Sequence, residues 1–239
     1  MQDRLVEQVA FTSRAAVKGA DRGGVRGVGL RFEGLGCMNI KKDPDMWDLD
    51  WAARGGLVIT PFHNPWSWMN DGTRAFVDEL VDAVLARHGL GAGTPIVATG
   101  GSMGGHGALV WAMYSRHKLA GCMANCPPAN LVAHYGERPD LPRTMHSAFG
   151  SYGDITAELE RHSPVHHPER LAKIPYLILQ GVTDTAVSKV LHGDVLVPKM
   201  RALGLEVDYQ VWETMGHCGP MSGEQYRYVM EWVARRWGG

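Results

Sequence analysis

The chain has 239 residues, a formal net charge of −1 and 21% charged residues. This length suffices for one large domain with a sizeable core and is too short for two full ones. The scattered basic residues argue against nucleic acid or an anionic membrane surface as a partner. No apolar run approaches the ~20 residues that span a bilayer, and the first residues carry acids where a signal peptide needs an apolar core. We therefore expect a cytoplasmic protein with one domain, residues 1–239.

The four cysteines, Cys37, Cys122, Cys126 and Cys218, show neither the spacing of a zinc cluster nor that of a disulfide framework. Cys122 and Cys126 are spaced i, i+4, but no histidine or cysteine accompanies them at zinc-finger spacing. The sequence therefore predicts four reduced thiols and no metal site.

Short runs rich in β-branched residues alternate with longer helix-patterned segments along the chain. The predicted strands are residues 25–32, 56–60, 95–99, 120–124, 176–180 and 206–212. The predicted helices are residues 71–87, 102–115, 187–203 and 222–237, and Gly193 and Pro198 interrupt the third of them. Such alternation is typical of an α/β fold with a mainly parallel sheet flanked by helices.

Residues 127–173 break this alternation. They contain six prolines and five histidines, and their apolar periodicity is weak. Loops of this length inside a compact domain are uncommon unless they have a function. We expect a small lid inserted in the main fold, with a long irregular crossover as the alternative.

Ser102 lies in the segment Gly100-Gly101-Ser102-Met103-Gly104-Gly105, directly after the predicted strand 95–99. The segment fits G-x-S-x-G, in which a nucleophilic serine is held on a strained turn between a strand and a helix. The flanking glycines suit this turn because neighbouring backbones approach closely there. Ser102 is therefore the predicted nucleophile, and a plain Gly-rich turn is the alternative.

A serine nucleophile needs a base to take its proton and an acid to orient that base. In the α/β-hydrolase layout these follow the serine in the order acid, then histidine, each after a strand. Asp184 follows the predicted strand 176–180, and His217 lies in a Gly-flanked loop after the strand 206–212. They are the predicted acid and base.

Other residues compete for these roles. Asp194 is an alternative acid, although it falls within or beside a predicted helix. Glu213 is a second alternative, but it is very close to His217 in the sequence. His106 is expected to be structural, because it lies on the helix that follows Ser102 and points away from the turn.

Two backbone N–H groups are needed to bind the oxyanion. We predict the N–H of Met103, which follows the nucleophile, and that of Leu35, which lies in the Gly-rich loop after strand 25–32. A plain glycine turn around Leu35 is the alternative. The loop of residues 60–70 supplies Phe62, His63 and Trp66 as predicted substrate contacts, unless its tryptophans pack under the following helix.

Residues 100–109 resemble the elbow of α/β-hydrolase esterases of the esterase D and S-formylglutathione hydrolase kind. The C-terminal half resembles the catalytic domain of prolyl oligopeptidase-type hydrolases, through residues 163–167, the strand ending at Gly181, Asp184 and the loop 215–217. The resemblance implies an α/β-hydrolase fold, a triad of Ser102, His217 and Asp184, and no cofactor. The chain departs from the pattern of this family at Glu33, where many relatives have a histidine.

We therefore expect a serine carboxylic-ester hydrolase that acts through an acyl-enzyme on a small or medium acyl ester. One alternative is a serine peptidase of the prolyl oligopeptidase type acting on short peptides, for which Glu33 is the candidate to bind a free amino terminus. The other alternative is a non-catalytic binding protein with a hydrolase fold. The expected partner is a small-molecule ester or a short peptide.

Overall fold

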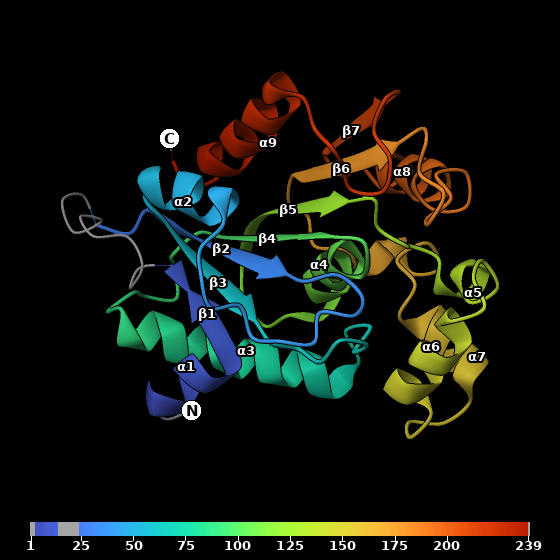
Figure 1. Ribbon diagram of the computed structural model, residues 1–239, viewed down its shortest axis with the longest axis horizontal. Helices are drawn as coiled ribbons and strands as arrows, with labels where there is room; N and C mark the ends of the chain where they lie inside the picture. Colours follow the sequence, from blue (N-terminus) through green and yellow to red (C-terminus); the bar gives the residue numbers. More distant parts are fainter. Residues whose placement is uncertain (1–2, 14–23, 239) are drawn as a thin grey trace.

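A computed structural model describes residues 3–13 and 24–238 of the chain (Figure 1). In this part, a seven-stranded sheet has the order β1-β3-β2-β4-β5-β6-β7. The strands are β1 (Ala10–Thr12), β2 (Gly27–Phe32), β3 (Gly56–Pro61), β4 (Ile96–Gly101), β5 (Leu119–Asn125), β6 (Tyr176–Gly181) and β7 (Val207–Trp212). β1 pairs antiparallel with β3, and all other neighbours pair parallel, which confirms the predicted mainly parallel sheet.

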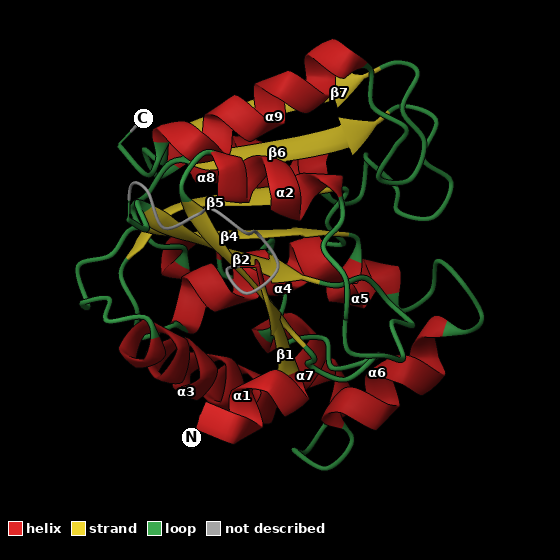
Figure 2. Ribbon diagram, turned by 60° about the vertical axis from the view of Figure 1, so that its left-hand side comes forward, coloured by secondary structure: helices red, strands yellow, loops and turns green. Residues whose placement is uncertain are grey.

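Helices cover both faces of the sheet, as parallel strands require. Outside residues 127–173, the described helices are α1 (Asp3–Val9), α2 (Met46–Ala53), α3 (Asp71–Arg87), α4 (Met103–Tyr114), α8 (Gly193–Ala202) and α9 (Gly223–Arg235). Along β4, Ile96 and Ala98 join the core under α3, α4 and α8, whereas Val97 joins the core under α2 and α9. Figure 2 shows α2 and α9 together, away from α1 and α3. Successive side chains of one strand therefore pack into two separate cores, one on each face of the sheet.

The third predicted helix begins six residues later than expected, at Gly193 instead of Val187. Residues 187–192 instead form turns, in which the backbone N–H groups of Leu191 and His192 bond the carbonyl of Ser188. The N–H of Val187 is bonded to the Asp184 side chain. The segment therefore follows the loop that holds Asp184.

The sequence did not predict α2. Its N-terminus is a capping box, in which Asp45 accepts hydrogen bonds from the N–H groups of Trp47 and Asp48, and Asp48 accepts from the N–H of Asp45. Arg31 and Lys41 pair with these carboxylates. The helix is stabilised by its cap and by the burial of Trp51, and not by a strong amphipathic pattern.

Residues 127–173 form short helices beyond the carboxyl ends of the strands, namely α5 (Leu131–His134), α6 (Leu141–Phe149), α7 (Ile155–Arg161) and a 3₁₀ turn, η3 (Pro168–Arg170). Figure 1 shows α5, α6 and α7 past the arrowheads of the sheet. They have a small core of their own, which packs on Trp68 and Met103. Within the described residues, no helix is both long enough and apolar enough to cross a bilayer.

Candidate active site

Ser102 lies between the end of β4 and the start of α4, with φ 56° and ψ −128°. A non-glycine residue with positive φ carries strain that the surrounding structure must hold. Here the N–H of Ser102 donates to the carbonyl of Asn125 at the end of β5, at 2.9 Å. The Ser102 side chain makes no capping hydrogen bond to α4. Its hydroxyl is therefore presented at the sheet edge and is not used to cap the helix.

Glycines on both sides of Ser102 allow this turn. A Cβ on Gly104 would lie 2.1 Å from the carbonyl oxygen of Phe32 in β2. A Cβ on Gly100 would lie 2.3 Å from the backbone of Gly104. Both contacts are with backbone atoms, which cannot rotate away, so a side chain at Gly104 would separate α4 from β2 and one at Gly100 would separate β4 from α4.

Asp184 and His217 come together at the same edge of the sheet, from the loops that follow β6 and β7. Nδ1 of His217 donates to Oδ2 of Asp184 at 2.9 Å. The Asp184 side chain is fully buried, and its Oδ1 accepts from the N–H groups of Ala186 and Val187 at 2.8 and 3.0 Å. The carboxylate therefore has a fixed orientation and fixes the His217 tautomer with Nε2 unprotonated in the neutral ring.

The electrostatics of this pair favour the charged forms of both side chains. Burial acts to lower the pKa of His217, but the hydrogen bond to Asp184 and contact with Cys126 raise it to about 9. Burial acts to raise the pKa of Asp184, but hydrogen bonds from His217, Val187 and Ala186 hold it below its usual range. The imidazolium that forms when His217 accepts a proton is thus stabilised.

Ser102 and His217 line one cleft of about 420 Å³. Within the part of the chain that the structure describes, no hydrogen bond joins the Ser102 hydroxyl to His217. Nε2 of His217 instead lies 4.0 Å from Sγ of Cys218. Catalytic hydrogen bonds are often long in unliganded enzymes and tighten when substrate binds, so this geometry is compatible with a Ser102–His217 pair.

The two N–H groups predicted to bind an oxyanion lie on the elbow and on the loop after β2. Met103 is the first residue of α4, where helix N–H groups lack an intrahelical partner. Leu35 and Ser102 both line the cleft. Among the described residues, neither the Met103 nor the Leu35 N–H donates to another backbone carbonyl.

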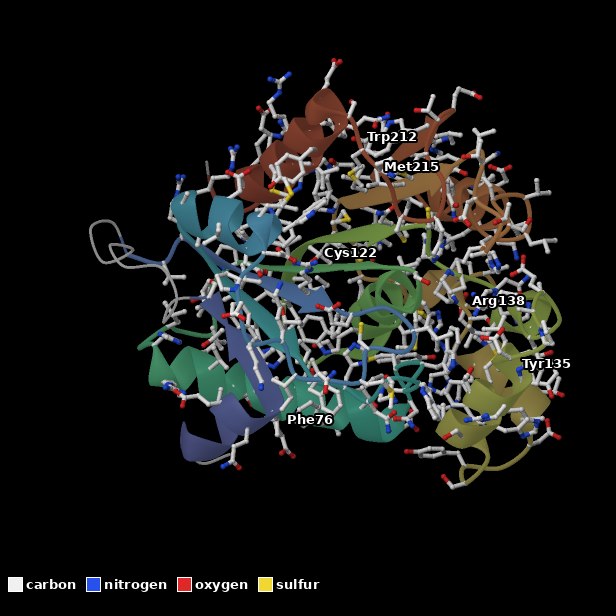
Figure 3. All side chains as sticks on the ribbon, viewed as in Figure 1. Phe76, Cys122, Tyr135, Arg138, Trp212 and Met215 are labelled. Atoms are coloured by element: carbon white, nitrogen blue, oxygen red, sulfur yellow. The ribbon has the colours of Figure 1, made fainter. Side chains whose placement is uncertain are left out.

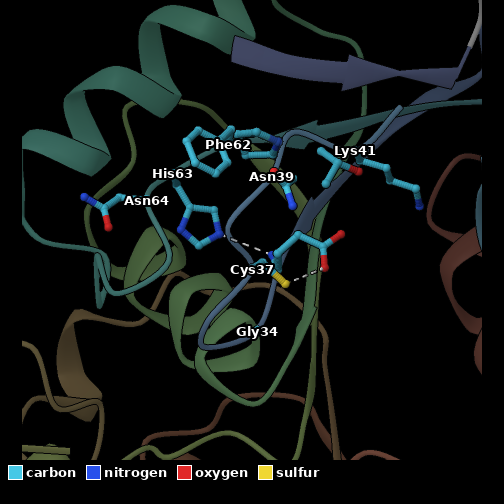
Figure 4. A pocket seen from close by; sticks show the side chains of 10 residues that line it. Gly34, Cys37, Asn39, Lys41, Phe62, His63 and Asn64 are labelled. Carbon is cyan, nitrogen blue, oxygen red and sulfur yellow. Dashed lines mark hydrogen bonds between the residues drawn. The ribbon is translucent and has the colours of Figure 1, made fainter. Parts of the chain in front are cut away.

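His63 lies behind the loop that carries Leu35, beside a second, smaller cavity (Figure 4). Its Nε2 accepts from the N–H of Glu33 at 3.2 Å, and its Nδ1 lies 2.9 Å from Oγ of Ser67. Burial lowers the pKa of His63 to about 4, so the ring is neutral and accepts at Nε2 while donating from Nδ1. His63 therefore positions the loop after β2.

Phe62 and Trp66, the other two predicted substrate contacts, also lie outside the walls described for the Ser102 cleft. Phe62 lines the same small cavity as His63. Trp66 is partly buried and lies under the Arg143 guanidinium, 5.5 Å from the ring centroid. Trp68 is buried under the short helices and donates from Nε1 to Thr144, so it packs instead of facing the cleft.

The alternative residues have structural partners. The buried Nε2 of His106 lies 3.3 Å from the carbonyl of Trp68, as its expected structural role requires. Asp194 pairs with Lys189 and accepts from the Tyr209 hydroxyl at 2.8 Å. Glu213 is exposed beyond β7.

Three charged side chains that line the cleft, Arg31, Glu33 and Arg138, went unpredicted or only partly predicted. Arg138 lines the cleft and forms a bidentate pair with Asp140. Figure 3 shows it near Tyr135, on the side of the molecule where the short helices lie. Glu33 lines the cleft from the opposite loop. The sequence around Arg138 is irregular and gives no strand-end signal, so only the three-dimensional arrangement identifies it.

The sequence profile of the prolyl oligopeptidase family matches residues 64–239. No curated protein matches the chain. Among solved structures, puromycin hydrolase has a TM-score of 0.73 at 17% identity, over 91% of this chain and 34% of that chain. Acylaminoacyl peptidase of Pyrococcus horikoshii has a TM-score of 0.73 at 13% identity, over 90% of this chain and 38% of that chain.

A smaller protein is similar over most of its own length. Esterase B of Lactobacillus rhamnosis has a TM-score of 0.69 at 14% identity, over 95% of this chain and 84% of that chain. By contrast, the chain spans only 34–38% of the puromycin hydrolase and the acylaminoacyl peptidase named above. At these identities the likeness concerns the fold, and it confirms the predicted α/β-hydrolase fold.

Proposed function

The chain belongs to the prolyl oligopeptidase family of serine hydrolases, and we propose that it cleaves small or medium acyl esters through an acyl-enzyme on Ser102. The observation that carries this proposal is the 2.9 Å hydrogen bond between His217 and Asp184 at the cleft that Ser102 lines. The cleft volume of about 420 Å³ is in the usual range for small-molecule sites.

In the proposed mechanism, Oγ of Ser102 attacks the ester carbonyl while Nε2 of His217 takes its proton. The tetrahedral intermediate collapses, His217 gives the proton to the leaving alcohol, and the acyl group stays on Ser102. Water then attacks the acyl-enzyme with His217 as base again, which releases the acid and regenerates Ser102. Asp184 orients the imidazole and stabilises its charge throughout.

The oxyanion of each tetrahedral intermediate is proposed to bind the N–H groups of Met103 and Leu35. One such donor contributes about 3–4 kcal/mol at the transition state. The hydrogen bond from Glu33 to His63 supports the role of Leu35, because it fixes the loop two residues before Leu35. We assign His63 to the support of this loop. Phe62 lines the cavity beside His63 and Trp66 packs under Arg143, so neither is proposed to contact substrate in the Ser102 cleft.

Residues 127–173 are proposed to act as a lid. Their helices pack on Met103, next to the nucleophile, and Arg138 reaches the cleft from this segment. The hydrogen bonds from Trp68 to Thr144 and from Asn70 to the carbonyl of Ala148 tie the segment to the main fold. The lid would therefore shape the acyl site as a fixed wall.

Hydrolysis of a 4-nitrophenyl ester series, compared with aminoacyl 4-nitroanilides, tests this function. We expect the wild-type enzyme to hydrolyse the esters and not to cleave the anilides. Ester turnover should fall at least ~10³-fold in Ser102→Ala. Ser151→Ala, at an exposed serine outside the cleft, is the matched control and should retain full activity. Absence of Ser102-dependent ester turnover would overturn the ester proposal.

A peptidase acting on short peptides is the second candidate, and the position of Glu33 favours it. The Glu33 carboxylate lines the same cleft as Ser102 and accepts a long hydrogen bond from Cys37 Sγ, at 3.6 Å. A carboxylate there suits a substrate with a free amino terminus. Cleavage of aminoacyl anilides that is lost on N-acetylation of the substrate, and weakened by Glu33→Gln, would select this candidate.

A further inference from the structure

We propose that Cys126, Cys218 and His217 form a binding site for a soft divalent cation such as Zn²⁺, and that the bound cation stops hydrolysis by occupying Nε2 of His217. The existence of the site stands on geometry alone. The inhibition rests on the proposed function, because it requires His217 to be the base for Ser102.

The three ligand atoms come from two loops that the sheet brings together. Cys126 directly follows β5, whereas His217 and Cys218 lie in the loop after β7. The two Sγ atoms and a ring nitrogen of His217 all lie within 4.8 Å of one another. Sulfur and imidazole nitrogen are the ligands that zinc prefers, and two cysteines with one histidine occur in zinc sites that keep a fourth position open.

The spacing of these atoms is close to what a tetrahedral cation requires. With zinc–sulfur bonds of about 2.3 Å and zinc–nitrogen bonds of about 2.0 Å, neighbouring ligand atoms are about 3.5–3.8 Å apart. Nε2 of His217 and Sγ of Cys218 are 4.0 Å apart already, and no pair exceeds 4.8 Å. Contraction by about 1 Å or less would complete the site.

The orientation of His217 suits a metal ligand. Its Nδ1–H donates to Asp184, so in the neutral ring the lone pair is on Nε2, which faces Cys218. Histidine ligands of metals commonly donate their other N–H to a carboxylate in this manner, which fixes the ring and strengthens the bond to the metal. The Asp184–His217 pair thus prepares Nε2 for a cation as well as for a proton.

Backbone constraints hold the two thiols toward each other. Cys126 and Cys218 both have positive φ, 46° and 62°, a backbone conformation that is costly for residues other than glycine. The N–H of Cys218 donates to Sγ of Cys126 at 3.5 Å, and Nδ2 of Asn125 donates to the carbonyl of Cys218 at 3.2 Å. The loop after β7 is therefore fastened to the end of β5 at the two ligands.

Two of the three ligands, His217 and Cys218, face the cleft, whereas Cys126 is buried. Cys218, His217 and Ser102 line the same cleft, and Sγ of Cys218 lies 3.1 Å from where a Cβ on Gly101 would stand. Binding of M²⁺ would form two metal–thiolate bonds and one metal–imidazole bond, and the two thiol protons, together with the Nε2 proton wherever His217 is an imidazolium, would go to solvent. His217 could then not accept the Ser102 proton.

Among the described residues, a second group of potential metal ligands, His134, Glu137 and His192, is held by internal hydrogen bonds and does not suit a metal. The N–H of Asn130 donates to Nδ1 of His192 at 3.1 Å, so Nε2 carries the proton and donates to Glu137 at 2.8 Å. This cluster uses its donors and acceptors in hydrogen bonds, and His192 has no lone pair facing Glu137. The cysteine-containing cluster differs because Nε2 of His217 has no strong hydrogen-bond donor.

Titration of the reduced protein with Co²⁺, and then with Zn²⁺, tests the site in buffer free of thiols and chelators. We expect one Co²⁺ per chain with thiolate-to-cobalt charge-transfer absorption, which disappears in Cys126→Ser and in Cys218→Ser. Cys37→Ser and Cys122→Ser, at thiols outside the cluster, are the matched controls and should keep the absorption. Zn²⁺ should displace the Co²⁺.

The inhibition is measured on the same samples with a 4-nitrophenyl ester. Zn²⁺ should abolish turnover by the wild-type enzyme, EDTA should restore it, and Cys126→Ser should need at least ~10-fold more Zn²⁺ for the same loss. A wild-type protein without thiolate-to-cobalt absorption, or equal Zn²⁺ sensitivity of Cys126→Ser, would overturn the proposal. The cobalt measurement decides the site even if no ester is turned over, so the two failures are distinguishable.

Discussion

The elbow around Ser102 and the loop around His217 lie at the same edge of the sheet but are held by different means. The elbow is fixed by backbone packing, since Gly104 leaves no room for a Cβ against Phe32. The His217 loop is fixed by side-chain contacts with Asp184 and the cysteines, and the His217 side chain is 30% exposed. Sterically locked positions should respond to substitution through stability, whereas positions held by polar contacts should respond through protonation and rate.

The largest effect that this contrast predicts is a loss of kcat when the orientation of the base, His217, is disturbed. Asp184→Asn should lower kcat by about 10³–10⁴-fold, because an amide no longer holds Nδ1–H of His217 and the unprotonated Nε2 is lost. The temperature of thermal unfolding should stay close to that of the wild type. Asp194→Asn is the matched control, since Asp194 pairs with Lys189 away from the triad, and it should keep kcat within a small factor.

The elbow should show the opposite behaviour. Gly104→Ala should destabilise the fold by about 3 kcal/mol or more, because its Cβ would collide with a backbone oxygen. Denaturant unfolding measures this loss. Gly107→Ala on the same helix is the control, because its Cβ would lie 3.0 Å from the flexible end of Met69 and an ordinary 3.7 Å from the Phe32 side chain, and its stability should change by less than about 1 kcal/mol. Equal losses in the two variants would contradict the steric account.

His63 combines both kinds of constraint, since a buried side chain holds a functional loop. His63→Leu removes the acceptor for the Glu33 N–H and should cost about 1–3 kcal/mol of stability. It should also lower kcat more than it changes KM, because the Leu35 N–H is displaced from the oxyanion. His63→Gln retains an acceptor and should recover part of kcat. A wild-type kcat in His63→Leu would contradict the role of His63 in positioning the oxyanion loop.

The smallest predicted effect is on the pH profile. Because the folded-state pKa of His217 is raised to about 9, kcat/KM should rise with pH and reach half of its plateau near pH 9, where half of the base is deprotonated. The hydrogen bond to Asp184 is the main cause of that increase, so the residual activity of Asp184→Asn should show its rise of kcat/KM at lower pH. Cys122→Ala, a buried thiol within β5, should leave the profile unchanged. A profile that is already flat at neutral pH would contradict this assignment.

Strand ends and glycine spacing made much of the fold predictable. The expected strands agree with β2 to β7 within two residues, and the helix predicted over residues 71–87 coincides with α3. These elements have strong apolar patterns. In contrast, α2 and the helices of residues 127–173 depend on caps and on tertiary packing, such as the Trp68 contact with Met103 and Leu131, which no local pattern reveals.

The site was predictable where a residue's role follows from its position after a strand. Asp184 and His217 were selected in this way, and the structure brings them into contact. The position of Arg138 in the cleft and the contact between Cys126 and Cys218 were not predictable, because they depend on how the loops after β5 and β7 meet. The expectation of no metal site came from sequence spacing alone and stays a prediction. The cation site proposed above would draw its ligands from two distant loops, which spacing does not detect.

The most direct test of the central claim is intact-mass analysis of the protein after reaction with a fluorophosphonate, followed by peptide mapping. The account predicts one adduct per chain, located on Ser102, and no adduct in Ser102→Ala. An adduct on another residue, such as Cys218, or ester turnover that continues in the Ser102→Ala variant, would contradict it.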